Sequence, residues 1–335
     1  MRLLFITQKI HKDDDDLAFT ILWVQEFIRQ GVDVQVICLE KGVFDDSFPV
    51  HSLYKERGAG LFTRIMRFFK LIFSLEYDAV FVHMNMEYVT LGGWWWLTKK
   101  PLYIWYTHYT MHIHLWLAGI FARKMFAATS QSMPQYDGNP KKVVTGHGID
   151  TQYWLSEVDT HPVTKSVHEI ISVHRLSRSK RLDIAIHAIA LLPSQYSLTV
   201  YGRPVDQEYY KELLALVKKE NLESRVHFMG PVPMGDLKYV YPKYSIMINM
   251  ASETIDKTML EGMLFGVFPI TTKGNAQAIG IDVYPEKDTP ESVAQLILSQ
   301  KINTYKNNDL RAIVESRHGL RALITRLNEY IVHGK

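Results

Sequence analysis

The sequence predicts an α/β protein with two doubly wound, mostly parallel sheets. Its 335 residues are enough for two domains at roughly 150 residues each. Short runs rich in β-branched and aromatic residues alternate with longer amphipathic segments, which is typical of parallel βαβ units. The alternation occurs twice, and a glycine-flanked turn at 146–150 separates the two occurrences.

The first half, residues 1–146, is expected to form one domain. Each of its apolar runs is short enough for a buried strand, and each intervening segment is long enough for a crossover helix. We expect strands at 3–7, 34–39, 79–83, 103–106 and 124–128, and helices at 17–30, 61–75 and 87–97.

The second half repeats the pattern and is expected to form a second domain, residues 151–316. We expect strands at 169–174, 197–201, 226–228, 246–250 and 267–271, and helices at 180–192, 207–220, 257–265 and 291–301. The amphipathic segment 309–331 is interrupted at His318-Gly319. It is either a surface helix or a break after which residues 317–335 pack back on the first domain.

Composition excludes several classes of protein. The net charge, 38 − 35 = +3, is too small to indicate a nucleic-acid binder. No apolar run is long enough to span a membrane, and the first residues read as a buried strand rather than a signal peptide. The single cysteine, Cys38, lies in an apolar run and is expected to be buried. These features predict a cytoplasmic protein.

Two cations stand where the strand at 169–174 ends and a helix begins. Arg175 and Lys180 would lie at the carboxyl edge of the sheet, where doubly wound proteins bind ligands. The helix dipole disfavours cations at this end, whereas a bound diphosphate would compensate for them. The alternative is a pair of solvated surface cations.

Two glutamates follow the strand at 246–250 and open at the same edge. Asp256 is expected to be the N-cap of a helix that carries Glu261, and Glu253 to lie on the preceding loop. One carboxylate would hold sugar hydroxyls and the other ribose hydroxyls, with backbone N–H groups between them aimed at phosphate. Glutamates at this spacing also occur by chance in many proteins.

These motifs, in this order, resemble the family 4 retaining glycosyltransferases of the GT-B fold. That family has an Arg…Lys pair upstream of two glutamates separated by seven residues. The turn at 146–150 is similar to its domain junction, and residues 260–269 are similar to its Leu-Glu-Ala-Met…Gly-Val-Pro run. The resemblance implies two Rossmann-like domains that transfer a sugar from a nucleotide diphosphate-sugar to a hydroxyl, with retention and without a metal or other cofactor.

The resemblance also implies roles for single residues. Arg175 and Lys180 would bind the donor diphosphate, helped by the start of the helix at Asp256 and Lys257. Glu261 would bind the ribose. The nucleobase region would include Met229 and Gly230, and the catalytic candidates would be His108, beside donor sugar and acceptor, and Glu253, on the transferred sugar.

The chain departs from the family pattern at several loops. Thr254, Ile255 and Asp256 stand where Gly-Phe-Gly is common, and the glycine-rich turn after the strand at 197–201 is reduced to Gly202-Arg203-Pro204. The glycine pair of the first strand–helix loop is absent from residues 13–19. We interpret these differences as marks of an unusual donor or a divergent subgroup.

Two segments suggest a peripheral membrane contact. The helix at 61–75 carries Arg64, Arg67 and Lys70 among apolar residues, and 94–100 combines three tryptophans with two lysines. Such segments either lie on an anionic membrane or pack within the domain. Membrane contact would suit a lipid-linked glycan as the acceptor, in cell-surface polysaccharide synthesis at the inner face of the membrane.

Two alternative functions share the predicted nucleotide pocket. A sugar-nucleotide epimerase has the same fold, and a non-catalytic nucleotide-sugar-binding protein would bind the donor without turning it over. A dinucleotide-dependent oxidoreductase is least supported, since no Gly-x-Gly-x-x-Gly motif follows the first strand. The acceptor is expected to be a glycan or a lipid-linked glycan.

Overall fold

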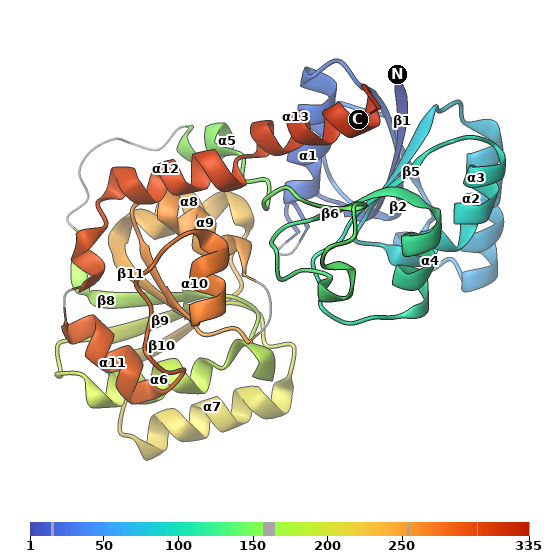
Figure 1. The fold of residues 1–335 in the computed structure, drawn as a ribbon. Helices are drawn as coiled ribbons and strands as arrows, with labels where there is room; N and C mark the ends of the chain where they lie inside the picture. The colour runs from blue at the N-terminus through green and yellow to red at the C-terminus, as the bar shows by residue number, and fades with distance from the viewer. Residues whose placement is uncertain (15–16, 157–164, 253–254, 300, 335) are drawn as a thin grey trace. The chain divides into compact units, whose positions relative to one another are not determined.

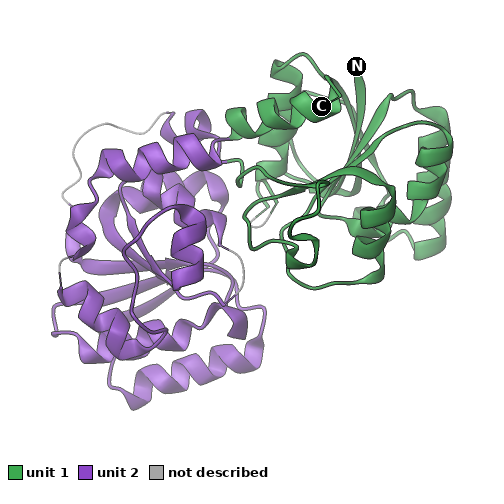
Figure 2. Cartoon of the chain, in the orientation of Figure 1, with its two compact units in different colours: residues 1–148, 320–335 green, residues 149–319 purple. Residues whose placement is uncertain are grey.

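The computed structural model describes residues 1–14, 17–156, 165–252, 255–299 and 301–334. The chain forms two compact units (Figure 2). Unit 1 comprises Met1–Gly148 with Leu320–Lys335, and unit 2 comprises Ile149–Gly319. Each unit has its own parallel sheet with helices on both faces (Figure 1), which confirms the predicted α/β fold.

Unit 1 contains a seven-stranded sheet in the order β3-β2-β1-β4-β5-β6-β7. Its strands are β1 (Arg2–Ile10), β2 (Asp33–Lys41), β3 (Val50–Ser52), β4 (Ala79–His83), β5 (Leu102–Trp105), β6 (Ala122–Ala127) and β7 (Lys142–Val144). Its helices are α1 (Phe19–Arg29), α2 (Leu61–Ser74), α3 (Gly92–Leu97), α4 (Ile113–Phe121) and α13 (Leu320–Ile331). Buried clusters on the two faces of the sheet form the core.

Unit 2 contains a five-stranded sheet in the order β10-β9-β8-β11-β12. Its strands are β8 (Ser166–Val173), β9 (Ser197–Tyr201), β10 (Val226–Gly230), β11 (Tyr244–Asn249) and β12 (Phe268–Thr271). Its helices are α5 (Thr151–Leu155), α6 (Leu182–Leu191), α7 (Gln207–Lys219), α8 (Met234–Val240), α9 (Lys257–Leu264), α10 (Lys273–Ile279), α11 (Pro290–Leu298) and α12 (Asn307–His318).

The C-terminal segment is divided between the units. α12 belongs to unit 2 and ends at His318, and α13 begins after Gly319 and belongs to unit 1. One face of α13 is buried in the unit 1 core, against α1. The residues that form this face are Leu320, Leu323, Ile324, Leu327 and Ile331.

Three further features were predicted from the sequence. Cys38 in β2 is 0% exposed, as expected, and burial raises the pKa of its thiol to about 12. Within the described residues, no helix is both long enough and apolar enough to cross a bilayer. The helix predicted at 87–97 is a 3₁₀ segment, Met86–Leu91, followed by α3.

Candidate functional site

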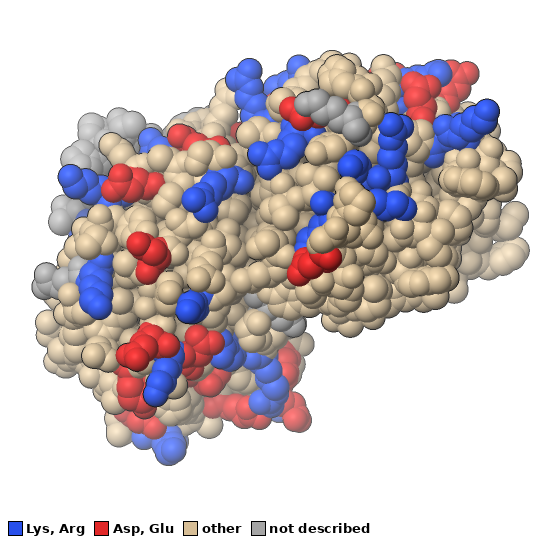
Figure 3. All heavy atoms as spheres, viewed as in Figure 1, with Lys and Arg blue, Asp and Glu red and all other residues tan. Residues whose placement is uncertain are grey.

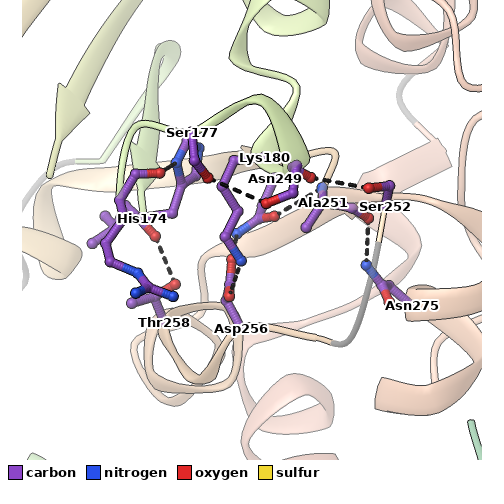
Figure 4. Close-up of polar contacts among 12 residues, drawn as sticks. His174, Ser177, Lys180, Asn249, Ala251, Ser252, Asp256, Thr258 and Asn275 are labelled. Carbon is purple, nitrogen blue, oxygen red and sulfur yellow. Dashed lines mark hydrogen bonds and ion pairs between the residues drawn. The ribbon is translucent and has the colours of Figure 1, made fainter. Parts of the chain in front are cut away.

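The predicted site segments meet at one edge of the unit 2 sheet. β8 and β11 are neighbouring parallel strands, so the residues that follow their carboxyl ends lie side by side. Ser252 donates its backbone N–H to the Ser179 carbonyl over 3.0 Å. Thr258 Oγ1 donates to the Val173 carbonyl over 2.7 Å, and Figure 4 shows these contacts joining the two segments.

Lys180 lies in a 3₁₀ turn, Arg178–Lys180, that precedes α6, rather than in the helix as predicted. It is only 9% exposed, and its Nζ donates to Asp256 Oδ1 over 2.6 Å. The second carboxylate oxygen of Asp256 accepts from Asn249 Nδ2 over 2.8 Å. The negative charge that we expected from a ligand is therefore partly supplied by Asp256 (Figure 4).

The N-cap prediction for Asp256 is right in position but wrong in mechanism. Asp256 occupies the N-cap position of α9, which carries Glu261 as expected. Within the described residues its side chain makes no capping hydrogen bond, because both carboxylate oxygens are already engaged by Lys180 and Asn249. The positive end of the α9 dipole is thus not neutralised by a capping side chain.

Glu261 lies inside unit 2, one helical turn beyond Lys257. Its Oε2 accepts from the Tyr241 hydroxyl over 3.2 Å. Burial raises the pKa of Glu261 to about 7, against the opposing effects of Lys257 and Tyr241. Burial likewise lowers the pKa of Lys257 well below its usual range, and Glu261 opposes this shift. Because the pKa of Glu261 is raised, the contribution of this residue to the free energy of unfolding falls as the pH rises from about 4.5 to about 7.

The other predicted donor residues lie along the same edge. Arg175 is the second residue after β8 and is exposed. Met229 and Gly230 end β10, where the backbone of Gly230 has a φ of +78°. The Gly202 N–H donates to the Gly230 carbonyl over 2.8 Å, which ties the turn after β9 to the end of β10.

Neither catalytic candidate belongs to the described part of unit 2. Glu253 lies outside the described residues. His108 belongs to unit 1, where it follows β5 and is exposed. Its ring contacts Tyr106 at a centroid distance of 5.2 Å, and its carbonyl accepts from the Met133 N–H over 3.1 Å.

Sequence reasoning missed two buried asparagines that hold the site together. Asn249 ends β11 and fixes Asp256, and Asn275 in α10 donates to the Ala251 carbonyl over 2.9 Å. Both side chains are almost completely buried. A polar residue at the end of an apolar strand was the available signal for Asn249, because a buried amide must find partners nearby.

Comparisons with known proteins agree with the fold and the motifs. The family model described as "Glycosyl transferase 4-like" matches residues 13–123, and the model "Glycosyl transferases group 1" matches residues 159–279. The two matches fall in different units. No curated protein matches the sequence significantly.

Several solved structures share the fold over nearly the whole chain. Anabaena HepE in complex with UDP and glucose has a TM-score of 0.80 at 17% identity, covering 99% of this chain and 100% of that one. Sucrose-phosphate synthase from Thermosynechococcus elongatus scores 0.77 at 14% identity, with coverages of 99% and 98%. WaaG, a glycosyltransferase involved in lipopolysaccharide biosynthesis, scores 0.70 at 14% identity, with coverages of 99% and 100%. Because one glycosyltransferase family model matches in each unit and the fold is shared with these structures, the chain belongs to the family 4 glycosyltransferases of the GT-B fold.

Proposed function

We propose that this protein transfers a sugar from a nucleotide diphosphate-sugar to a hydroxyl of a glycan or lipid-linked glycan, with retention of the anomeric configuration. The observation that carries the proposal is the nearly buried side chain of Lys180, five residues after Arg175, at the carboxyl edge of the unit 2 sheet. Family membership supports the reaction class. The HepE complex with UDP and glucose supports a nucleotide-sugar donor.

The chemical task of the site is to stabilise a departing nucleoside diphosphate. The bond between the sugar C1 and the diphosphate oxygen breaks, and a bond from C1 to the acceptor oxygen forms on the same face. The acceptor proton passes to the leaving phosphate. Arg175, Lys180 and the backbone N–H groups at the N-terminal end of α9, at Asp256 and Lys257, would stabilise the negative charge that develops. Cationic side chains would thus replace a metal ion.

The remaining donor groups would be held by neighbouring residues. Glu261 would accept hydrogen bonds from the ribose hydroxyls, and Met229 and Gly230 would border the nucleobase. Glu253 on the transferred sugar and His108 near sugar and acceptor complete the proposal, on the strength of the family resemblance.

A ligand panel followed by product analysis tests this function. We expect one of UDP, GDP and ADP, with its sugars, to raise the melting temperature most, because a ligand that binds only the native state stabilises it. The matching donor and a glycan acceptor should then give a glycoside with the donor's anomeric configuration by NMR. Transfer should persist in EDTA.

The same panel separates the alternatives. A sugar-nucleotide epimerase would convert the donor without an added acceptor. A non-catalytic binder would be stabilised by the donor but form no product with any acceptor. Either result, or stabilisation by no nucleotide at all, would contradict the proposed transfer.

The proposal includes a lipid-facing surface on unit 1. Phe62 in α2 is 77% exposed, and Trp96 in α3 is 68% exposed. Phe73 and Trp94 join these helices through an edge contact at 5.4 Å. α4, which packs on α3, adds Ile113, Trp116 and Ile120 as exposed apolar side chains, and the surface over α4 carries no charged residue in the view of Figure 3.

The charges around this apolar surface favour an anionic bilayer. Residues 61–75 contain Arg64, Arg67 and Lys70 and no acidic residue, and Lys99 and Lys100 follow α3. The exposed tryptophans suit the interface between headgroups and acyl chains. Large exposed apolar patches are rare on soluble monomers and mark surfaces that bind a membrane, another protein or a ligand.

Co-sedimentation with lipid vesicles tests this surface. We expect the protein to bind vesicles that contain phosphatidylglycerol and to bind phosphatidylcholine vesicles much more weakly. Replacing Phe62 and Phe73 with serine should weaken binding about tenfold or more, since buried apolar area drives insertion. Replacing Val167 and Leu191 of unit 2, which are also exposed, with serine is the matched control. Equal binding by the two double variants would contradict the assignment.

A further inference from the structure

The lysine proposed to bind the donor diphosphate already has a partner of its own. Lys180 Nζ lies 2.6 Å from Asp256 Oδ1, and both side chains are largely shielded from solvent, at 11% and 22% exposure. Figure 4 shows the ammonium turned toward the carboxylate. Salt screens a shielded ion pair of this kind much less than a surface pair. The Asp256 carboxylate therefore competes with other anions for Lys180.

The carboxylate of Asp256 is also fixed in place from its other side. Asn249 donates to Oδ2 over 2.8 Å, and Asn249 is itself 0% exposed, with its Oδ1 accepting from the Ala251 N–H over 3.2 Å. Burial would raise the pKa of Asp256, but Lys180 and Asn249 outweigh it and hold that pKa below its usual value. Asp256 is therefore an anion at neutral pH.

The charge of this anion is not explained by helix capping, although its ion pair with Lys180 joins two segments of the site. It does not cap α9, and the family commonly has glycine at this position. The backbone of Asp256 has φ −80° and ψ 140°, which an L-residue adopts without strain, so glycine is not needed here and aspartate is tolerated. What distinguishes aspartate is its charge, placed beside Lys180.

We propose that Asp256 is a resident counter-ion of Lys180 that competes with the diphosphate of the donor. It weakens the binding of nucleoside diphosphates and speeds release of the nucleoside diphosphate product. This inference rests on the proposed function of Lys180 in diphosphate binding.

Calorimetric titration of the Asp256→Asn variant tests the competition. Asparagine keeps the size of the side chain and can still accept from Lys180 or Asn249, but it removes the negative charge. We expect UDP and inorganic pyrophosphate to bind about tenfold more tightly than to the natural protein, which corresponds to about 1.4 kcal/mol. Uridine, which has no phosphate, should bind equally to both. In transfer assays the KM for the donor should fall, and kcat should fall with it if product release limits the rate.

Two further variants make the result decisive. Asp256→Gly removes the whole side chain and should also tighten pyrophosphate binding, so a folding defect of Asp256→Asn does not block the test. Asp288→Asn is the matched control, because Asp288 pairs with the adjacent cation Arg181 at 2.9 Å. The Asp288→Asn variant should bind UDP and pyrophosphate as tightly as the natural protein does.

The outcomes separate this inference from the proposed function. Unchanged or weaker binding of UDP and pyrophosphate by both Asp256 variants would overturn the counter-ion role, because a residue that merely positions Lys180 would lower affinity when replaced. If Lys180→Met binds UDP as well as the natural protein does, the assignment of Lys180 to the diphosphate fails instead. Loss of UDP binding in Lys180→Met together with tighter binding in Asp256→Asn supports both.

Discussion

Replacing Lys180 with methionine is expected to lower sugar transfer by about 10²–10³-fold, the loss typical of removing one preorganised electrostatic group. Lys180 is 9% exposed, so its charge acts in a poorly screened environment at the edge where the donor would bind. Methionine keeps the length of the side chain and removes the ammonium. Initial rates at subsaturating donor, together with the stabilisation by UDP, measure the effect.

Two control variants distinguish a loss of sugar transfer from a loss of protein stability. Arg178→Met removes a cation two residues away that pairs with Glu212 on the surface, and it should transfer sugar almost normally. Lys180→Met also leaves the largely shielded Asp256 carboxylate without its ammonium partner, which lowers stability. The double variant Lys180→Met/Asp256→Asn should regain stability but not transfer. Undiminished transfer by Lys180→Met would remove the main support for the proposed donor site.

Replacing Gly202 with alanine is expected to destabilise the protein by about 3 kcal/mol or more. A Cβ at this position would lie 1.8 Å from the His174 carbonyl oxygen, and the backbone of Gly202 has a φ of +150°. The clash is with backbone, which a side-chain rotation cannot relieve. Urea unfolding of the variant and the natural protein measures the difference in the free energy of unfolding.

The backbone shift that Gly202→Ala causes should also extend to the candidate site. His174 precedes Arg175, so moving its carbonyl shifts the segment that carries a proposed diphosphate cation, and UDP affinity should fall. Gly31→Ala is the matched control, because Gly31 has a φ of +83° and a Cβ added there would meet, among the described residues, no atom within 4 Å beyond its chain neighbours. It should lose only about 1–2 kcal/mol. Equal losses in the two variants would contradict the steric argument.

The central strands were predictable because strands buried on both faces read as continuous apolar runs. β1 and β4 lie where such runs occur in the sequence. β3 and β7 were missed, because each has three residues, too few for any pattern to show. α4 was missed because apolar residues occur all around it, so its sequence has no clear helical face.

The position of the candidate site in the fold could be predicted from the sequence, but the contacts between its side chains could not. Parallel strands end at one edge, so Lys180 and Asp256 could be assigned to the same neighbourhood from spacing alone. Their ion pair joins residues 76 positions apart, and it depends on side-chain directions that no local pattern encodes. The sequence correctly predicted that Asp256 occupies an N-cap position. Its carboxylate makes no capping hydrogen bond among the described residues, because it accepts from Lys180 and Asn249 instead.

The single, fully buried Cys38 makes this protein a convenient starting point for site-specific labelling. Its thiol is shielded by the unit 1 core and stays protonated near neutral pH, so maleimides should react with it slowly. A cysteine introduced at Trp116 would then be the one fast-reacting thiol of the chain. An environment-sensitive fluorophore attached there would report directly whether α4 enters a bilayer, without any need to remove the natural cysteine first.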